Sequence, residues 1–167
     1  LRHPRRPRLA ATRKGTNGVN DDLKISWIGL GKLGLPMAAR IAASGRAVAG
    51  FDLDPARAEL AAARQIQVRP DARAALEGAG VVFTSLPDDA GLEAALRDLA
   101  PLVARGAVIV ETSTVSAAAS TRAGAVLAAA GVVYLRAPVS GNPVLAERGE
   151  LTVLASAARA AFDAALP

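Results

Sequence analysis

The sequence contains no cysteine, and His3 is its only histidine among 167 residues. The absence of cysteine excludes disulfide bonds, thiolate metal sites and cysteine nucleophiles. A single histidine also makes Ser-His-Asp catalysis and histidine-ligated metal sites implausible. Aromatic residues make up only 3% of the chain, so the core must depend on close packing of small residues rather than on large side chains. Hydrophobic residues make up 51% of the chain and alanine occupies 40 of the 167 positions, a composition typical of one globular domain.

Positive charge is concentrated at the start of the chain. Residues 1–14 contain five arginines, one lysine and no acidic residue, whereas the remaining residues carry 14 basic and 15 acidic side chains. We therefore expect residues 1–22 to form a disordered basic extension and residues 23–167 to form the folded domain. No apolar run approaches the ~18–20 residues of a membrane helix, and the basic segment lacks the apolar core of a secretory signal. A cytoplasmic domain without a membrane partner is expected.

From Lys24 onward, short apolar runs alternate with alanine-rich helical stretches. Strands are predicted at residues 25–28, 47–51, 81–85, 107–111 and 132–135, with a weak strand at 65–68. Helices are predicted at residues 35–44, 55–64, 72–77, 89–100 and 116–130. A Pro/Gly/Asn-rich loop over 138–149, a strand over 150–155 and a helix over 157–166 complete the prediction. This alternating order predicts an α/β fold, a doubly wound and mainly parallel sheet with helices on both faces.

A glycine-rich segment at residues 29–34, GLGKLG, directly follows the first predicted strand and precedes a predicted helix. Gly29 permits a tight turn, Gly31 lets a pyrophosphate approach the backbone, and Gly34 allows close contact between helix and strand. An acidic residue, Asp52, ends the next strand, as a Rossmann-type dinucleotide-binding fold requires. An ordinary glycine turn would not need this context, so the pattern predicts dinucleotide binding.

The acidic residue also indicates which dinucleotide is bound. The Asp52 carboxylate can accept hydrogen bonds from the adenine-ribose hydroxyls and would repel a 2′-phosphate. Residues 51–54 read FDLD and place no arginine beside the acid to hold that phosphate. NAD is therefore favoured over NADP. The following Asp54-Pro55 pair is interpreted as the N-cap and first residue of the next helix.

Residues 27–38, WIGLGKLGLPMA, resemble the opening of the β-hydroxyacid dehydrogenases, the 3-hydroxyisobutyrate dehydrogenase-like family related to 6-phosphogluconate dehydrogenase. Three later segments resemble the same family in the same order: Leu86-Pro87, residues 111–115 (ETSTV), and residues 137–141 (APVSG) with 149–153 (GELTV). The resemblance covers residues 24–167. It implies an NAD-binding domain of the 6-phosphogluconate dehydrogenase type, the N-terminal domain only of such an enzyme.

The resemblance implies a set of binding residues and no metal site. The cofactor-binding residues would be Gly29, Leu30, Gly31, Lys32, Leu33, Gly34, Asp52, Leu86, Pro87 and Thr114. The substrate-binding residues would be Ser140, Gly141 and Asn142. Plain structural roles remain open for several of them: Leu86-Pro87 can simply end a strand, Ser113 and Thr114 can serve a turn or N-cap, and Ser140-Gly141 can form a turn.

Two positions depart from the family's pattern, because Arg136 stands where an acid is common and Asn142 where a second glycine is usual. The family's catalytic lysine is implied to lie in a second, helical domain. Lysine occurs here only at positions 14, 24 and 32, so no catalytic residue is assigned and the 167-residue chain alone is expected to be inactive. Tyr134 could carry a proton, although its strand position favours packing.

The predicted function is thus the NAD-binding domain of an oxidoreductase that interconverts a small 3-hydroxy acid and its oxo acid or semialdehyde. One alternative is an NADPH-linked imine or aldehyde reductase relative, which Asp52 disfavours. Another is a non-catalytic dinucleotide-binding module whose basic arm contacts nucleic acid; this is disfavoured because no aromatic residue is interleaved for base stacking. Binding to DNA at two salt concentrations, with and without residues 1–22, separates these readings. The sequence leaves homo-oligomerisation open.

Overall fold

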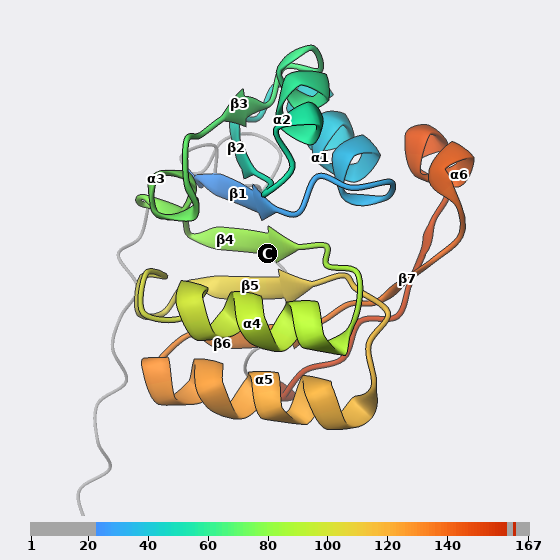
Figure 1. Ribbon diagram of the computed structural model, residues 1–167. Helices are drawn as coiled ribbons and strands as arrows, with labels where there is room; N and C mark the ends of the chain where they lie inside the picture. Colours follow the sequence, from blue (N-terminus) through green and yellow to red (C-terminus); the bar gives the residue numbers. More distant parts are fainter. Residues whose placement is uncertain (1–22, 160–161, 163–167) are drawn as a thin grey trace, which may run out of the picture.

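The computed structural model describes residues 23–159 and 162, so the predicted basic extension and most of the predicted last helix lie outside the described residues. Its centre is a six-stranded sheet in the order β3-β2-β1-β4-β5-β6, in which every neighbouring pair is parallel (Figure 1). The strands are β1 (Ile25–Ile28), β2 (Val48–Phe51), β3 (Gln67–Val68), β4 (Val81–Thr84), β5 (Val108–Glu111) and β6 (Val133–Arg136). The predicted Rossmann-type, doubly wound sheet is confirmed.

Helices cover both faces of this sheet. They are α1 (Gly34–Ala43), α2 (Pro55–Ala62), α3 (Ala72–Leu76), α4 (Asp89–Leu99) and α5 (Ala117–Ala130). One apolar core joins the sheet to α3, α4 and α5, and a second joins it to α1 and α2. Alanines at the helix–sheet contacts, such as Ala38 and Ala119, are fully buried, which lets the backbones approach closely. Burial on both faces explains why the strands are mainly apolar.

The helix ends follow their capping residues. Asp54 is the N-cap of α2, where its side chain accepts a hydrogen bond from the Ala56 amide at 2.9 Å. Asp88 and Ser116 cap α4 and α5 in the same way. Gly131 ends α5 in a left-handed conformation at φ 74°. The Asp54-Pro55 interpretation is confirmed, and the predicted element boundaries differ from the observed ones by one or two residues.

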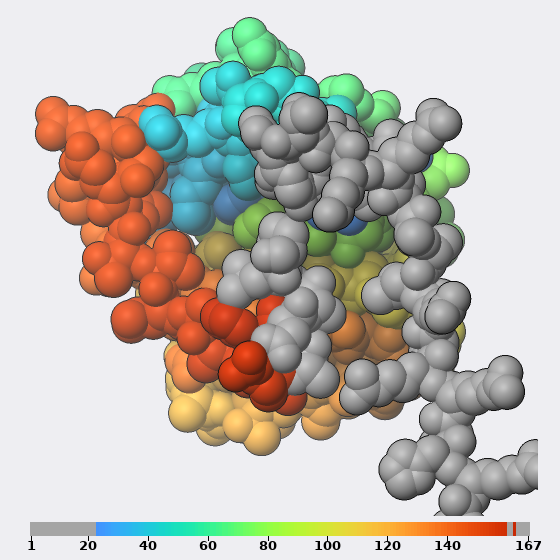
Figure 2. All heavy atoms as spheres, turned by 180° about the vertical axis from the view of Figure 1, so that it is seen from behind, coloured from blue at the N-terminus to red at the C-terminus, as the bar shows by residue number. Residues whose placement is uncertain are grey.

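The prediction of a loop over residues 138–149 is wrong. This segment contains a short strand, β7 (Val139–Ser140), and a six-residue helix, α6 (Pro143–Arg148), whose N-cap is Asn142. The predicted strand over 150–155 shrinks to β8 (Thr152–Val153), which pairs antiparallel with β7 outside the main sheet. We call residues 139–153 the C-terminal arm. Viewed from behind, this arm, in orange, lies beside the cyan of α1 (Figure 2). The Arg40 guanidinium of α1 donates to the Glu147 carbonyl at 2.9 Å, and Arg64 pairs with the Glu147 carboxylate.

None of the helices in the described part of the chain is long and apolar enough to cross a membrane. Within residues 23–159 and 162, no group of three or more His, Asp or Glu side chains is arranged to hold a metal ion.

Candidate functional site

A cavity of about 720 Å³ opens where the strand order reverses, at the carboxyl ends of β1, β2 and β4. In a doubly wound sheet, the loops that follow the two central strands run to opposite faces of the sheet. They leave a crevice between them, and ligands bind in this crevice. The predicted residues among its lining come from three separate loops: Gly29, Gly31, Lys32, Leu33, Asp52, Leu86 and Pro87. The fold therefore gathers seven of the ten predicted cofactor residues around one cavity.

The glycine loop has the geometry that its sequence suggests. Gly29 has φ +89°, and a Cβ added there would lie 2.2 Å from the Ser85 carbonyl oxygen of the neighbouring loop. A Cβ on Gly34 would lie 2.1 Å from the Gly29 carbonyl oxygen and 2.9 Å from Trp27 Nε1. A Cβ on Gly31 would meet nothing within 4 Å, because this residue faces the open cavity. Gly29 and Gly34 are thus required for packing, while Gly31 leaves space for a ligand.

The start of α1 lies at the edge of the cavity, where Gly31, Lys32 and Leu33 line it. The Leu35 amide is bonded to the Gly31 carbonyl at 3.1 Å and Pro36 has no amide, so the backbone of the glycine loop rather than a row of free amides faces the cavity. The N-cap position of α1 is Leu33, whose side chain cannot accept a hydrogen bond, so no side chain caps this helix. Exposed Lys32 lies beside it on the cavity wall. The positive end of the helix dipole, without a side-chain cap, and the ammonium group of Lys32 together favour an anion.

Leu30, unlike its neighbours Gly29 and Gly31, is a core residue. Its side chain is fully buried in the core against α1 and β2 and does not line the cavity. Its backbone amide donates to Asp52 Oδ2 at 2.6 Å, and the Asp54 amide donates to Asp52 Oδ1 at 2.9 Å. Each Asp52 oxygen keeps a free lone pair, so the half-buried carboxylate can fix the glycine loop and still accept hydroxyl groups from a ligand.

Hydrogen bonds join the turns after β4 and β5. The Leu86 amide donates to Ser113 Oγ at 2.7 Å, and Thr112 Oγ1 donates to the Thr84 carbonyl at 2.7 Å. Leu86 and Pro87 line the cavity, whereas Thr114 is exposed on the next turn and does not line it. Ser113 is a bridge between turns, and the N-cap of α5 is Ser116, so neither Ser113 nor Thr114 caps that helix.

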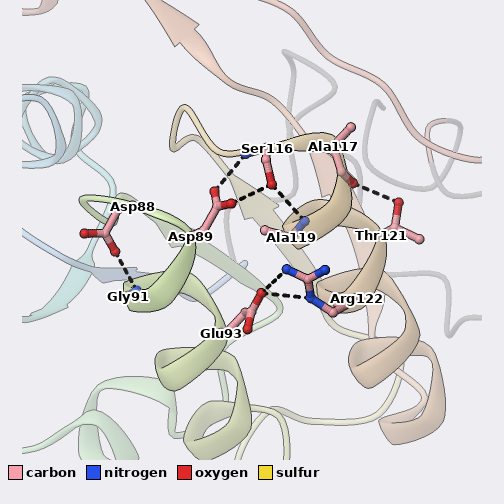
Figure 3. A network of polar contacts seen from close by, with 9 residues as sticks. All are labelled: Asp88, Asp89, Gly91, Glu93, Ser116, Ala117, Ala119, Thr121 and Arg122. Carbon is pink, nitrogen blue, oxygen red and sulfur yellow. Dashed lines mark hydrogen bonds and ion pairs between the residues drawn. The ribbon is translucent and has the colours of Figure 1, made fainter.

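The turn at residues 112–116 is also held from its outer side. Asp89 at the start of α4 accepts hydrogen bonds from the Ser116 amide at 2.8 Å and the Ser116 hydroxyl at 2.5 Å (Figure 3). These two hydrogen bonds lower the pKa of Asp89 below its ordinary value, and the bond from the hydroxyl contributes more than the bond from the amide. One turn further on, Glu93 and Arg122 form an exposed ion pair between α4 and α5 at 2.5 Å (Figure 3).

Beneath the same turn lies a buried carboxyl group. Glu111 is fully buried at the end of β5, and its Oε1 accepts a hydrogen bond from the Ser113 amide at 2.6 Å. Burial raises the pKa of Glu111 above its ordinary value of 4.5, although the bonds from Ser113 and the charge of Arg136 act in the opposite direction. Tyr134 is held nearby through a 2.9 Å hydrogen bond between its hydroxyl and Ser120 Oγ, which accords with a packing role.

Replacing Glu111 by glutamine should stabilise the fold more at high pH than at low pH. The raised pKa means that the carboxyl group's contribution to stability is fully present below pH 4.5 and is lost as pH rises through the folded-state pKa. Glutamine keeps an oxygen for the Ser113 amide and does not ionise. We expect the melting temperature of Glu111→Gln minus that of the wild type to increase between pH 4 and pH 8. A difference that stays constant or decreases would contradict this assignment.

The predicted substrate residues lie on the C-terminal arm, away from the cavity lining. Ser140 is exposed on β7. The start of β7 is joined to the residue after β5 by a hydrogen bond from the Val139 amide to the Thr112 carbonyl at 3.2 Å. Asn142 Oδ1 accepts from the Leu145 amide at 3.0 Å as the cap of α6, which leaves the Asn142 side-chain NH₂ outside this contact. Gly141 stands between them with φ +145°.

Sequence reasoning missed one wall of the cavity. Gly91, Ala94, Ala95 and Asp98 of α4 line it together with Leu99, and Phe51, Leu53 and Ala72 complete this apolar end. Positions 91, 94, 95 and 98 recur at helical spacing and are mostly small, which is a signal that could have been read as a face lying against a ligand. Asp98 is the one acidic group on that face.

Comparison with known proteins agrees with the geometry. Residues 24–167 match the model of a family described as the NAD binding domain of 6-phosphogluconate dehydrogenase. The chain belongs to this family. The predicted resemblance is confirmed.

Individual relatives extend the comparison. The domain is 33% identical over 152 residues to 2-(hydroxymethyl)glutarate dehydrogenase of Eubacterium barkeri, covering 89% of this chain and 50% of the relative. It is 31% identical to NAD-dependent L-serine dehydrogenase of Pseudomonas aeruginosa, covering 86% and 49%. A solved structure of Mycobacterium tuberculosis 3-hydroxyisobutyrate dehydrogenase with L-serine superimposes with a TM-score of 0.83 at 30% identity, covering 87% and 50%. The chain spans about half the length of the relatives it matches.

Proposed function

We propose that the domain binds NAD across the cavity at the switch point of the sheet. The observation that carries this proposal is the convergence of the glycine loop, the uncapped start of α1 and Asp52 on one cavity. The pyrophosphate would lie on Gly31, Lys32 and the first turn of α1. The Asp52 carboxylate would accept hydrogen bonds from the ribose hydroxyls. Leu86 and Pro87 would contact the cofactor where it extends from β1 toward β5.

Charge supports NAD rather than NADP as the cofactor. Asp52 and Asp98 are the acidic residues of the cavity lining, and Lys32 is the one basic side chain among the residues that line the described cavity. Arg57, the nearest arginine in sequence, faces Asp54 at 3.9 Å. A 2′-phosphate beside Asp52 would therefore meet negative charge. The NADPH-linked reductase alternative is not favoured.

The names of the relatives suggest the substrate class. 2-(Hydroxymethyl)glutarate, L-serine and 3-hydroxyisobutyrate share one feature: a CH₂OH group on the carbon that bears a carboxylate. We therefore infer that the domain serves an oxidoreductase that interconverts such a small 3-hydroxy acid and its oxo acid or semialdehyde. The Ser140 hydroxyl, the amide at Gly141 and the Asn142 side-chain NH₂ are donors suited to the substrate carboxylate.

The 167-residue polypeptide alone should bind NADH without family-like turnover. Oxidation of the hydroxyl requires a proton acceptor, which typically contributes ~10²–10⁴-fold, and no lysine or histidine follows Lys32 in the sequence. Assays with 3-hydroxyisobutyrate, L-serine and glycerate, monitored by NADH fluorescence, should show no appreciable rate. Turnover of about 1 s⁻¹ or more would contradict this expectation and would make Tyr134 or an acidic residue the candidate base.

A fluorescence titration tests the proposed function itself. NADH should bind the purified chain saturably, and ADP should displace it, because both share the groups that contact Asp52 and the glycine loop. The Gly31→Ala variant is the matched probe, since its methyl group occupies ligand space without touching the protein. Absence of saturable NADH binding by the wild type would refute the proposal.

A further inference from the structure

A row of polar side chains crosses the sheet beneath α4 and α5. Thr84, Glu111 and Arg136 are the last residues of β4, β5 and β6, and they are register partners across the three strands. Register partners in a parallel sheet project from the same face. Thr84 and Glu111 are fully buried and Arg136 is half-buried.

Each member of this row has a buried polar atom without a hydrogen-bond partner among the described residues. These atoms are Thr84 Oγ1, Glu111 Oε2 and Arg136 Nε. Unsatisfied buried polar groups are few in folded proteins, and three in adjacent register call for an explanation other than packing. Stability alone would favour apolar residues at these positions.

Both charged members hold the same turn. Glu111 Oε1 accepts from the Ser113 amide at 2.6 Å, and Arg136 Nη2 donates to the Val115 carbonyl at 3.2 Å. Ser113 Oγ in turn accepts from the amide of Leu86, which lines the cavity. A continuous path of contacts thus runs from the buried row through the turn at residues 112–116 to the wall of the proposed cofactor site.

Arg136 balances the charge of Glu111 without a direct ion pair between them among the contacts of the described residues. The guanidinium still acts on the buried carboxyl group, because its charge lowers the pKa that burial raises. Removing the guanidinium would leave the carboxylate buried without a cation and would release the Val115 carbonyl at the same time.

The position of this turn indicates which half of a dinucleotide it affects. A doubly wound sheet binds one nucleotide in each of its halves, on either side of the switch point. Asp52 and the glycine loop serve the adenosine side at β2 and β1, so the turn after β5 lies on the nicotinamide side. We propose that Glu111 and Arg136 are positioning residues that shape the turn at residues 112–116 to receive the nicotinamide half of the cofactor.

This inference rests on the proposed function, and the experiment separates the two. Binding of NADH and of ADP to the full chain is measured by calorimetry for the wild type, Glu111→Ala, Arg136→Met and Ser113→Ala. We expect each variant to weaken NADH by roughly fivefold to tenfold, the effect of about one hydrogen bond, with ADP affinity changed less than about twofold. Glu111→Gln, which keeps an acceptor for the Ser113 amide, should retain nearly wild-type NADH affinity.

Glu93→Ala is the matched control, because Glu93 pairs with Arg122 on the exposed side of the same helices and touches none of the turn's contacts. It should leave both affinities unchanged. Parallel loss of NADH and ADP binding in the variants, or loss of neither, would overturn the inference. If Glu111→Ala or Arg136→Met fails to fold, Arg136→Gln, which removes the charge but keeps a polar side chain, decides the question by the same NADH and ADP measurements. Ser113→Ala tests the link from the turn to the cavity wall, since it removes the hydroxyl that accepts from the Leu86 amide. Failure of the wild type to bind NADH would instead refute the proposed function.

Discussion

Asp52→Ala should weaken NADH binding by roughly tenfold to a hundredfold, because a charge-assisted hydrogen bond is worth ~1.5–3 kcal/mol. The same change should improve tolerance of NADPH, since the charge that opposes a 2′-phosphate disappears. The structure adds a second consequence. Asp52 accepts hydrogen bonds from the Leu30 and Asp54 amides, so alanine also removes the group that fixes the glycine loop.

Asp52→Asn separates these two effects. Asparagine keeps one acceptor oxygen for a backbone amide but removes the negative charge. We expect it to lose less NADH affinity than alanine while gaining a similar tolerance of NADPH, as measured by calorimetric titration with both cofactors. If both variants keep the wild-type preference between NADH and NADPH, Asp52 does not set cofactor selectivity.

Gly34→Ala should destabilise the fold severely. The added methyl group would lie 2.1 Å from the Gly29 carbonyl oxygen, and backbone at this tight turn cannot move aside as a flexible side chain could. Overpacking typically costs about 1–3 kcal/mol, and we expect about 3 kcal/mol or more, or a loss of roughly 6–12 °C in melting temperature for a domain of this size.

Gly31→Ala is the control for this effect, since its methyl group meets no protein atom within 4 Å. It should keep the wild-type melting temperature within about 1–2 °C and weaken NADH, because it reduces the space for the pyrophosphate. Equal destabilisation by the two substitutions would show that the glycines serve backbone freedom alone.

The fold was predictable because most of its parallel strands are short, mainly apolar runs, and alanine-rich helices separate these runs. The glycine loop and Asp52 could be placed at one site because the carboxyl ends of parallel strands meet at one edge. The part of the candidate site that we propose for the pyrophosphate and the ribose could therefore be predicted from the sequence.

Helix α6 was missed although its ends carry capping signals. Asn142 at the N-cap, Pro143 at the first position and Gly149 in a left-handed conformation at φ 73° mark a helix, but the same residue types also favour turns. Six residues form a stable helix only through outside contacts, which here come from Arg40 and Arg64 to Glu147. The sequence separation of these partners hides that support.

The relation between Glu111 and Arg136 at the ends of β5 and β6 could not be predicted from the sequence. Arg136 was recognised only as an unexpected residue, because its relation to Glu111 depends on a register between strand residues that are 25 positions apart in the sequence. The contribution of α4 to the cavity wall depends in the same way on how that helix packs. Local patterns identify elements, whereas these contacts arise from their packing.

Calorimetric titration of the wild-type chain with NADH and with NADPH tests the central claim most directly. The account predicts saturable binding of NADH with one site per chain and at least tenfold weaker binding of NADPH, as repulsion at Asp52 of about 1.4 kcal/mol or more would give. Equal or tighter binding of NADPH, or no binding of either cofactor, would contradict it.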